Sequence, residues 1–352
     1  MRKIAVIPGD GIGIEVIKGA IQVLKKSEEI IFDKSLFDFS FFDWGTDYYL
    51  KNNMMMPENA LDVLANFDSI LLGAVGHPKV QDHITLNGLL LPIRRKFDQY
   101  VSVRPCYLWK NTESVLKNAL DLDFVIIREN SEGEYANIGG FLHTSNEYDT
   151  SIQTSVFTRM GCMRIIEYAF EHALKRNNKL KVTSVTKSNA QAFGMVMWDN
   201  CFKEVSQKYP NINTESLLVD AACMDLVRRP EDFDVIVASN LFGDILSDLG
   251  AGITGGMGTA PSSNINPVQD YPSMFEPVHG SAPDITGQGV ANPLAAILSG
   301  SMMATYLGYP KIEYIIREAV QKTINDNIIT KDMGGNNSTD EVINNVESSL
   351  MI

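Results

Sequence analysis

Strand-like runs alternate with helix-like segments along this chain of 352 residues. The clearest apolar runs cover residues 3–7, 69–76, 123–128 and 233–238, and a segment with helical spacing follows each, directly or after a loop. Strands that alternate with helices favour a mainly parallel sheet. Each helix carries the chain back to the end of the sheet where the previous strand began, so the next strand runs in the same direction. Ligands of such sheets lie at the carboxyl ends of the strands. The residues that follow each run are therefore the candidate site.

A glycine-rich turn follows the first run, with the sequence Pro8-Gly9-Asp10-Gly11-Ile12-Gly13. Its spacing is G-x-G-x-G rather than the G-x-G-x-x-G of a dinucleotide-binding fold, and no acidic residue ends a second strand convincingly. The turn therefore disfavours an ordinary Rossmann site. The glycines are better explained by a close approach of the chain near a ligand.

The charge and cysteine content exclude several classes of partner. A net charge of -13 argues against nucleic acids and anionic membranes. The four cysteines form no C-x-x-C pair, which indicates buried thiols in a reducing compartment. No apolar run reaches the ~20 residues of a membrane span, and the N-terminus enters a strand without room for a signal peptide. The sequence predicts a cytoplasmic protein.

Two aspartates lie four residues apart after the run at 233–238. On a helix, Asp244 and Asp248 share one face, where their like charges repel unless a cation lies between them. Apolar neighbours such as Ile245 predict a largely buried helix, which favours a hard divalent cation with oxygen ligands. The same spacing fits an acidic first turn that suits the helix dipole. Asp220, at the tip of a predicted strand over 215–220, is a third candidate ligand.

Three arginines occupy comparable places in the predicted structure. Arg94 lies on a predicted helix over 89–98, and Arg104 and Arg128 lie at strand ends. In an acidic chain, such a cluster suits a small polycarboxylate, which arginine binds through two parallel hydrogen bonds. Pairing of each arginine with a local Glu or Asp explains the pattern equally well.

A lysine and a histidine also follow predicted strands or loops. Lys187 comes directly after a strand over 181–186, where a lysine can act as an acid or base, although a solvated lysine at a strand end is the commoner case. The Gly/Pro-rich loop over 276–287 is long and polar, which indicates a functional loop. Its His279 suits stacking on a base, and a capping histidine fits nearly as well.

Several of these segments occur together in one family. The chain resembles the β-decarboxylating dehydrogenases, whose members act on isopropylmalate, isocitrate, homoisocitrate, and tartrate or D-malate. The resemblance runs from residues 4–13 to residues 332–335. Its most specific pieces are Asn240-Leu241-Phe242-Gly243-Asp244-Ile245-Leu246-Ser247-Asp248 and Phe275-Glu276-Pro277-Val278-His279-Gly280-Ser281-Ala282-Pro283-Asp284.

The resemblance implies a two-domain α/β fold of the isopropylmalate dehydrogenase type, with a large mixed sheet, and not a Rossmann fold. Residues 1–99 and 255–352 would form a large domain that carries the cofactor loops. Residues 100–254 would form a central domain with the metal site and the dimer interface, including an irregular polar arm over 138–153. A homodimer with active sites shared between subunits is expected, or a tetramer built from such dimers.

The resemblance also implies a role for each candidate residue. Tyr135 is the expected catalytic acid, and Lys187 of the partner subunit is the expected catalytic base. The expected substrate-binding residues are Arg94, Arg104, Arg128, Asn87, Leu90 and Leu91. The expected ligands of Mg²⁺ or Mn²⁺ are Asp220, also from the partner subunit, Asp244 and Asp248. The expected cofactor-binding residues are His279, Gly280, Ser281, Ala282, Asp284, Ile285 and Asn292.

The chemistry of this family gives each group a task. A metal chelated by the substrate lowers the pKa of its hydroxyl and stabilises the enolate that forms when carbon dioxide leaves. The arginines position the carboxylates so that the right one departs. NAD is the expected cofactor, because Asp284 would accept hydrogen bonds from ribose hydroxyls and repel a 2′-phosphate. NADP-using relatives carry a lysine and a tyrosine where this chain has Asp284 and Ile285.

The substrate is predicted from the helix before Arg94. Isocitrate is disfavoured, because Gly88 and Leu90 replace the serine and asparagine of isocitrate enzymes. Segments 82–86 and 97–100 most resemble the tartrate/D-malate group, although Asn87 replaces its usual tryptophan. We therefore expect oxidation and decarboxylation of (R)-malate to pyruvate and carbon dioxide, together with activity on tartrate. The alternative is 3-isopropylmalate, whose enzymes usually carry a glutamate in place of Asn87.

Two other classes fit the sequence less well. A non-catalytic regulatory subunit of this fold should have lost catalytic residues, yet Tyr135, Lys187 and all three aspartates are present. A metal-dependent hydrolase would need no adenosine loop.

Overall fold

The computed structural model describes residues 1–117, 119, 121–143, 147 and 149–351. The chain divides into two compact units. Unit 1 comprises Met1–Gln99, Arg104–Leu122 and Gly250–Ile352, and unit 2 comprises Tyr100–Val103 and Asp123–Leu249. Among the described helices, none is long and apolar enough to cross a membrane. The predicted boundaries of the two folding domains stay a prediction.

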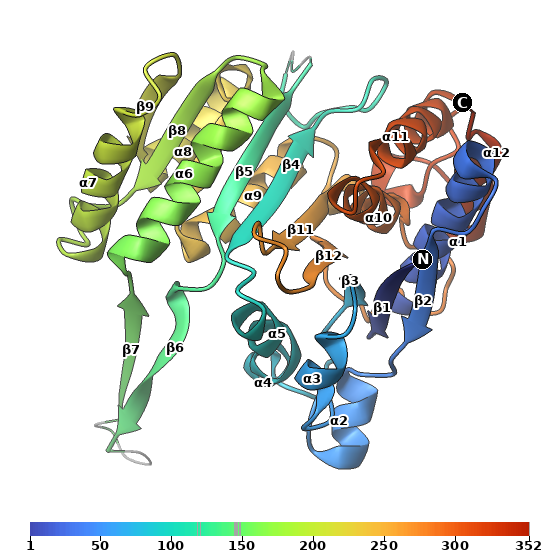
Figure 1. Cartoon of the computed structure of the whole chain (residues 1–352), viewed down its shortest axis with the longest axis horizontal. Helices are drawn as coiled ribbons and strands as arrows, with labels where there is room; N and C mark the ends of the chain where they lie inside the picture. Colours follow the sequence, from blue (N-terminus) through green and yellow to red (C-terminus); the bar gives the residue numbers. More distant parts are fainter. Residues whose placement is uncertain (118, 120, 144–146, 148, 352) are drawn as a thin grey trace. The chain divides into compact units, whose positions relative to one another are not determined.

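Unit 1 contains a mixed sheet (Figure 1). Its strands follow the order β2 (Phe37–Phe41), β1 (Arg2–Gly9), β3 (Ser69–Ala74), β12 (Ser273–Pro277), β11 (Pro261–Ile265) and the later part of β4 (Val101–Tyr107). The pairs of β1 with β2, β1 with β3, and β3 with β12 are parallel, whereas β11 runs antiparallel to β12. The carboxyl ends of β1, β3 and β12 therefore lie at one edge of this sheet.

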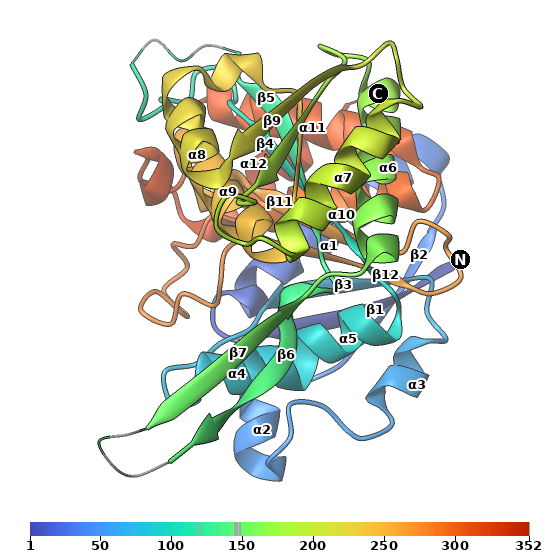
Figure 2. The ribbon, with the colours of Figure 1, turned by 90° about the vertical axis from the view of Figure 1, so that its left-hand side faces the viewer.

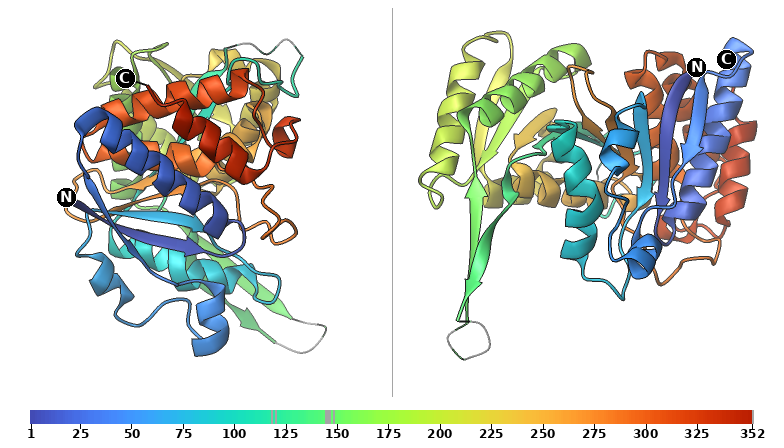
Figure 3. Two further views of the ribbon diagram at one scale, coloured as in Figure 1. Left: turned by 90° about the vertical axis from the view of Figure 1, so that its right-hand side faces the viewer. Right: turned by 60° about the horizontal axis from the view of Figure 1, so that its bottom comes forward.

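Helices cover both faces of the unit 1 sheet. The four helices α1 (Gly13–Phe32), α10 (Leu294–Tyr306), α11 (Pro310–Asn325) and α12 (Thr339–Ser348) pack together, as the blue and red segments in the left panel of Figure 3 show. Alternate residues of β1 feed two separate cores. Ile4 and Val6 pack with these helices, whereas Ala5 and Ile7 pack with the opposite cluster. This period of two explains why β1 reads as a continuous apolar run.

The opposite core of unit 1 contains the helical segment that carries Arg94. It is built from α2 (Thr46–Asn52), α3 (Ala60–Leu64), α4 (Asp82–Thr85), the π-helical turn η1 (Leu86–Leu90) and α5 (Leu91–Lys96). The sequence predicted one helix over 89–98, whereas the structure has a π-helical turn followed by a short α-helix. A π-helical turn of five residues is too short for an apolar pattern to distinguish it from an α-helix.

The strands of unit 2 are mainly parallel, although the first of them runs antiparallel to the second. The start of β4 is followed by β5 (Asp123–Glu129), β10 (Val235–Ala238), β8 (Lys181–Thr186) and β9 (Asn213–Leu218). Its helices are α6 (Arg159–Arg176), α7 (Gly194–Ser206), α8 (Val219–Arg228) and α9 (Asn240–Ile253). In Figure 1, α6 lies in front of this sheet, and α8 and α9 lie behind it. The strands of the two units together confirm the predicted α/β class with a large mixed sheet.

The arm predicted as irregular is a regular ribbon. Strands β6 (Gly133–Leu142) and β7 (Thr150–Val156) pair antiparallel and extend away from the rest of unit 2 (Figure 2). Both faces of the ribbon are largely exposed, including Ile138, Phe141, Leu142 and Ile152. A ribbon that buries neither face in its own chain lacks the alternation that reveals a strand.

Two further elements differ from the sequence-based prediction. Strand β9 ends at Leu218 and α8 begins at Val219, so Asp220 lies in the first turn of a helix rather than at a strand tip. Residues 251–263, whose Gly, Thr, Ser and Pro content is typical of a loop, include the end of α9 and the start of β11. The start of β11 is polar, with Pro261, Ser262 and Ser263, and therefore resembles a loop although it is buried.

Candidate active site

The glycine-rich turn brings three backbone segments of unit 1 into close contact. A Cβ on Gly9 would lie 1.9 Å from the oxygen of Ala74, and a Cβ on Gly11 would lie 2.0 Å from the oxygen of Ser281. The amide of Ile12 donates to the same Ser281 oxygen at 2.9 Å. The glycines are therefore required where backbone meets backbone, and the turn supports the loop that follows β12.

That loop carries the predicted cofactor residues. The ring nitrogen Nδ1 of His279 lies 3.0 Å from the oxygen of Gly280, which suits a protonated Nδ1 that donates. Burial lowers the pKa of His279, so the ring is neutral. Its Nε2 is buried, and no described residue hydrogen-bonds to it. The ring therefore offers one acceptor to a ligand. Asp284 is exposed at the same loop.

Asn292 is held rigidly beside this loop. Its Nδ2 donates to Asp332 Oδ2 at 3.0 Å, and its Oδ1 accepts from the amide of Leu294 at 3.0 Å. A Cβ on Gly258 would lie 2.3 Å from Asp332 Oδ2 and 2.7 Å from Asn292 Nδ2, so only glycine fits there. With its side chain engaged in this way, Asn292 contributes shape and backbone groups to the predicted cofactor site.

Arg94 pairs with a distant carboxylate rather than a local one. Its side chain is 8% exposed, and its NH2 group lies 2.8 Å from Glu276 Oε1. Asn264 donates to the same oxygen at 2.7 Å. The Nε–H group of Arg94 is buried without an acceptor among the described residues. One side of the guanidinium is thus anchored, and an unsatisfied donor remains for a substrate carboxylate.

The remaining predicted substrate residues of unit 1 lie on β4 and on the helical segment before Arg94. Arg104 is buried on β4. Leu90 belongs to the hydrophobic core with Ala5 and Ile7, so it supports the helix from behind. Leu91 is also buried, with 6% exposure. Leu90, which was predicted to line the substrate pocket, is therefore part of the hydrophobic core.

In unit 2, Arg128, Tyr135 and Asp244 form one connected array. Arg128 donates from Nε and NH2 to Asn240 Oδ1, at 3.0 and 2.8 Å, and its NH1 contacts Asp244 Oδ1. The hydroxyl of Tyr135 donates to the other oxygen of Asp244 at 2.9 Å. The guanidinium also lies over the Tyr135 ring, 5.2 Å from its centroid. A predicted acid, a predicted substrate arginine and a predicted metal ligand are therefore in mutual contact.

Lys187 and Asp220 form a second pair in the same unit. Lys187 Nζ lies 2.6 Å from Asp220 Oδ1. The hydrogen bond from Lys187 lowers the pKa of Asp220, so the carboxylate is ionised. The Asp220 side chain is 67% exposed, against 27% for Lys187, so the carboxylate is open to a ligand or to another chain. Lys187 and Asp220, which are both expected to contribute to the active site of the partner subunit, are therefore in contact with each other on this chain.

The aspartates on α9 face outward. Asp244 and Asp248 are both partly or fully exposed, and Ile245 between them is 49% exposed. The largely buried helix expected from the sequence is therefore wrong on this face, because positions 244, 245 and 248 share one side of the helix. Hard carboxylate oxygens open to solvent fit a divalent cation such as Mg²⁺ or Mn²⁺.

A single chain does not assemble three such ligands among the residues described. No described group of three or more His, Cys, Asp or Glu residues could hold a metal ion. Asp220 lies on α8 and pairs with Lys187, which directly follows β8. The contribution of Asp220 from a second copy stays a prediction.

Asn240, Glu276 and Asp10 are functional candidates that the sequence did not single out. Asn240 and Glu276 each hold an arginine from a distant part of the chain. Asp10 is buried and accepts hydrogen bonds from the amide and hydroxyl of Thr46, at 2.7 and 2.6 Å, and from the amide of Gly76 at 2.9 Å. All three lie inside the motifs over 8–13, 240–248 and 275–284. Membership of these motifs was the only sign of their function in the sequence, because the residues that they contact are remote in the chain.

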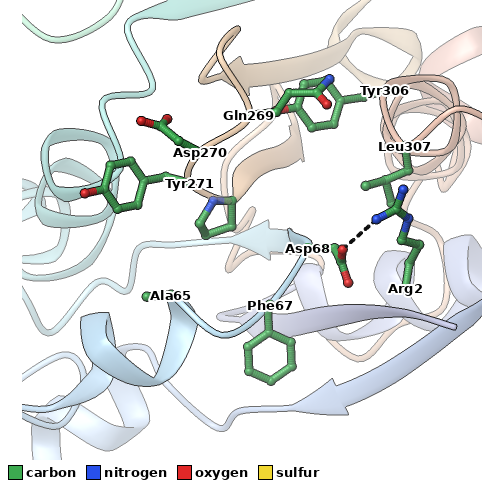
Figure 4. A pocket seen from close by; sticks show the side chains of 10 residues that line it. Arg2, Ala65, Phe67, Asp68, Gln269, Asp270, Tyr271, Tyr306 and Leu307 are labelled. Atoms are coloured by element: carbon green, nitrogen blue, oxygen red, sulfur yellow. Dashed lines mark hydrogen bonds and ion pairs between the residues drawn. The ribbon is translucent and has the colours of Figure 1, made fainter.

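A polar pocket in unit 1 lies at the opposite edge of the sheet from Asp10 and Glu276. It has a volume of about 180 Å³, and the ion pair of Arg2 with Asp68 lies at its wall (Figure 4). Arg2, Asp68 and Pro272 stand at or just before the starts of β1, β3 and β12. The pocket is therefore at the amino ends of the parallel strands, where α/β proteins do not usually bind their ligands.

Comparisons with known proteins agree with this arrangement. A profile of the isocitrate/isopropylmalate dehydrogenase family matches residues 3–346. A probable tartrate dehydrogenase/decarboxylase of Agrobacterium vitis is 47% identical over 342 residues, covering 97% of this chain and 95% of the relative. The D-malate dehydrogenase (decarboxylating) of Escherichia coli K12 is 46% identical over 351 residues, covering 97% and 96%. The isocitrate dehydrogenase structure from Methylococcus capsulatus has a TM-score of 0.90 at 33% identity, covering 99% of both chains.

The profile match confirms the family resemblance, and the solved isocitrate dehydrogenase confirms the predicted fold type. The match extends from the glycine-rich turn to the last helix, so it includes every predicted site residue. The chain therefore belongs to the isocitrate/isopropylmalate dehydrogenase family, and it is a decarboxylating dehydrogenase that is similar along nearly its whole length to tartrate and D-malate enzymes.

Proposed function

We propose that this protein oxidises and decarboxylates an (R)-2-hydroxy dicarboxylic acid with NAD and a divalent cation. (R)-Malate, converted to pyruvate and carbon dioxide, is the proposed substrate, together with tartrate. The similarity to D-malate and tartrate enzymes supports this choice over isocitrate. The observation that carries the proposal is the contact of each proposed proton-transfer residue with a proposed metal-ligand carboxylate, Tyr135 with Asp244 and Lys187 with Asp220.

Proton transfer is assigned to these two residues. Lys187 would take the proton of the substrate hydroxyl as hydride leaves the same carbon for the nicotinamide. Tyr135 would protonate the carbon that loses carbon dioxide, and its contact with Asp244 keeps its hydroxyl oriented near the bound acid. A divalent cation held by Asp220, Asp244 and Asp248 would supply a positive charge beside the hydroxyl oxygen and the neighbouring carboxylate.

Substrate binding is assigned to the arginines. Arg94 is anchored by Glu276 and keeps a buried donor without an acceptor among the described residues. Arg128 is anchored by Asn240 in the same way. Arginines fixed by other side chains lose little conformational entropy on binding, so they hold a dicarboxylate in a single orientation. Arg104 is proposed as the third carboxylate-binding residue.

NAD is the proposed cofactor, bound by the loop over 279–285 together with Asn292. The exposed carboxylate of Asp284 suits the hydroxyls of an adenosine ribose and would repel the 2′-phosphate of NADP. His279 Nε2 offers an acceptor in the same loop. The backbone oxygen of Ser281 in this loop contacts Gly11 and accepts a hydrogen bond from the amide of Ile12, so the glycine-rich turn holds the loop in place without a ligand.

A homodimer with shared sites is proposed as the working form. The β6–β7 ribbon exposes four large apolar side chains, with Phe141 at 77% and Ile138 at 53% exposure. Apolar patches of this kind mark protein interfaces. The outward position of Asp220, away from the α9 aspartates, supports its contribution to the site of a second copy.

The test is a substrate panel followed by NADH absorbance in the presence of Mg²⁺ or Mn²⁺. (R)-Malate should be turned over with a larger kcat/KM than 3-isopropylmalate or isocitrate, and NAD should be preferred to NADP. A kcat/KM for 3-isopropylmalate well above that for (R)-malate would replace the proposal with its alternative.

A further inference from the structure

Asp10 lies in the glycine-rich turn, and its carboxylate joins three segments of unit 1. Oδ1 accepts a hydrogen bond from the amide of Thr46 at 2.7 Å. Oδ2 accepts from the hydroxyl of Thr46 at 2.6 Å and from the amide of Gly76 at 2.9 Å. The backbone amide of Asp10 donates to the oxygen of Ala74 at 2.8 Å. Asp10 directly follows β1, and it therefore binds the segments that follow β2 and β3.

The Asp10 carboxylate is buried, and both of its oxygens are used as acceptors. The residue is 7% exposed. A Cβ on Gly45, the residue before Thr46, would lie 2.8 Å from Asp10 Oδ1, so the bare backbone of Gly45 makes room for the carboxylate. Three donors on two oxygens match a carboxylate, and they do not match an amide, which has only one oxygen. A buried polar group of this kind is stable only when its hydrogen bonds are made.

Ser281 of the proposed cofactor loop contacts both sides of this junction. A Cβ on Gly76 would lie 3.2 Å from Ser281 Oγ, and a Cβ on Gly11 would lie 2.0 Å from the backbone oxygen of Ser281. The amide of Ile12 donates to the same oxygen at 2.9 Å. Gly76 is bonded to the Asp10 carboxylate, and Gly11 follows Asp10 in the chain. A displacement of Asp10 would therefore move both neighbours of Ser281.

We propose that Asp10 is a positioning residue that sets the affinity for NAD. Its carboxylate fixes the two segments against which the cofactor loop packs, so it acts through Gly76 and Ser281. A loop that is held in its binding conformation loses less conformational entropy when the ligand binds, and binding is tighter. Arg94 and Arg128 are held by other side chains, so substrate binding should depend little on Asp10. This inference rests on the proposed NAD site and deepens it.

Asp10→Asn tests the inference, because it keeps the shape of the side chain and exchanges one acceptor for a donor. Whichever way the amide turns, its NH₂ group faces the backbone N–H of either Thr46 or Gly76. Two donors that face each other must move apart. The Kd for NAD, measured by calorimetry, should rise by about tenfold or more. At saturating NAD, kcat and the KM for (R)-malate should each change by less than about threefold.

Two variants of Thr46 and one remote control accompany it. Thr46→Val keeps the shape and removes the hydroxyl donor, so the Kd for NAD should rise by about threefold, which keeps the test available if Asp10→Asn does not fold. Thr46→Ser keeps the hydroxyl and should retain the Kd of the unmodified protein. Asp68→Asn is the matched control at the opposite edge of the same sheet. Its oxygens accept from Arg2 at 3.0 Å and from the amide of Lys3 at 2.7 Å, and its loss should leave the Kd for NAD unchanged.

A purely structural role for Asp10 would lower the Tm and the number of NAD sites per chain, and would leave the Kd of the folded fraction unchanged. That result would overturn the inference. So would an equal rise in Kd for Asp68→Asn, or a KM for (R)-malate that rises as much as the Kd for NAD. If the unmodified protein binds no NAD, the proposed function fails, and this inference fails with it. If the unmodified protein and Asp10→Asn bind NAD equally well, only this inference fails.

Discussion

Gly243 lies on α9 directly against Arg128, and its replacement by alanine should harm catalysis more than stability. A Cβ at this position would lie 2.6 Å from Arg128 Cβ, 2.7 Å from its Cγ and 3.2 Å from its Cα. These atoms are the rigid base of the side chain rather than its flexible end. The new methyl group must therefore shift Arg128 away from Asn240 and Asp244.

The expected loss of stability is small because two effects oppose each other. Alanine is favoured over glycine within a helix by up to about 1 kcal/mol. Overpacking a tight contact costs about 1–3 kcal/mol. The net decrease in the free energy of unfolding should therefore be about 0–2 kcal/mol. A displacement of about 1 Å in a substrate-binding group can lower the rate by ~100-fold, so kcat/KM for (R)-malate should fall by that order.

Gly252→Ala is the matched control on the same helix. A Cβ there meets no atom within 4 Å in the described structure. This variant should keep its activity and gain stability from helix propensity alone. Urea unfolding and steady-state NADH production measure both quantities. Equal activity of the two variants would refute the argument that Gly243 fixes the position of Arg128.

Lys187→Met should lower NADH production by about 100-fold or more while NAD affinity, measured by calorimetry, stays unchanged; a retained rate would contradict its role as the base. Mg²⁺ or Mn²⁺ at about 100 times its Kd should stabilise the protein by about 2.7 kcal/mol and raise its Tm. Asp248→Asn should reduce this rise in Tm. A Tm that neither ion changes, with or without substrate, would count against the metal site. Burial lowers the pKa of His172 to about 4. In the unfolded chain the pKa of this histidine is 6.5, so below that pH the unfolded state binds a proton that the folded state does not. The free energy of unfolding should therefore fall by at most about 2 kcal/mol between pH 6.5 and pH 5. His172→Gln should flatten that slope, and equal slopes would refute the assignment.

The sequence predicted best those elements whose local pattern coincides with their packing. The first apolar run, over 3–7, and the helical segment that follows it are β1 (Arg2–Gly9) and α1 (Gly13–Phe32). Both are apolar on the faces that enter the core, so periodicity reports their burial. The position of Lys187 directly after β8 was predicted for the same reason.

The contacts of the site could not be predicted, because they join residues that are far apart in the chain. Glu276 lies 182 residues from Arg94, and Asn240 lies 112 residues from Arg128. Neither partner is distinguished by residue type from many other polar side chains. The alternative that each arginine pairs locally is wrong for Arg94, because only the fold brings β12 beside α5.

The β6–β7 ribbon was missed as a regular element for a different reason. Its strands pair only with each other, and most of their side chains are exposed within this chain. A sequence pattern reports burial, so it cannot identify a strand that stays exposed in a single copy.

The separation of Lys187 and Asp220 from Tyr135 and Asp244 has a genetic consequence. If each site takes one pair from each copy, a chain defective in Lys187 and a chain defective in Tyr135 carry defects in different halves of a site. In a mixed dimer, both defects then fall in one site, and the other site receives neither. Equal mixtures of the two inactive variants, refolded together, should regain about a quarter of the normal activity, since half of the dimers are mixed and each has one intact site.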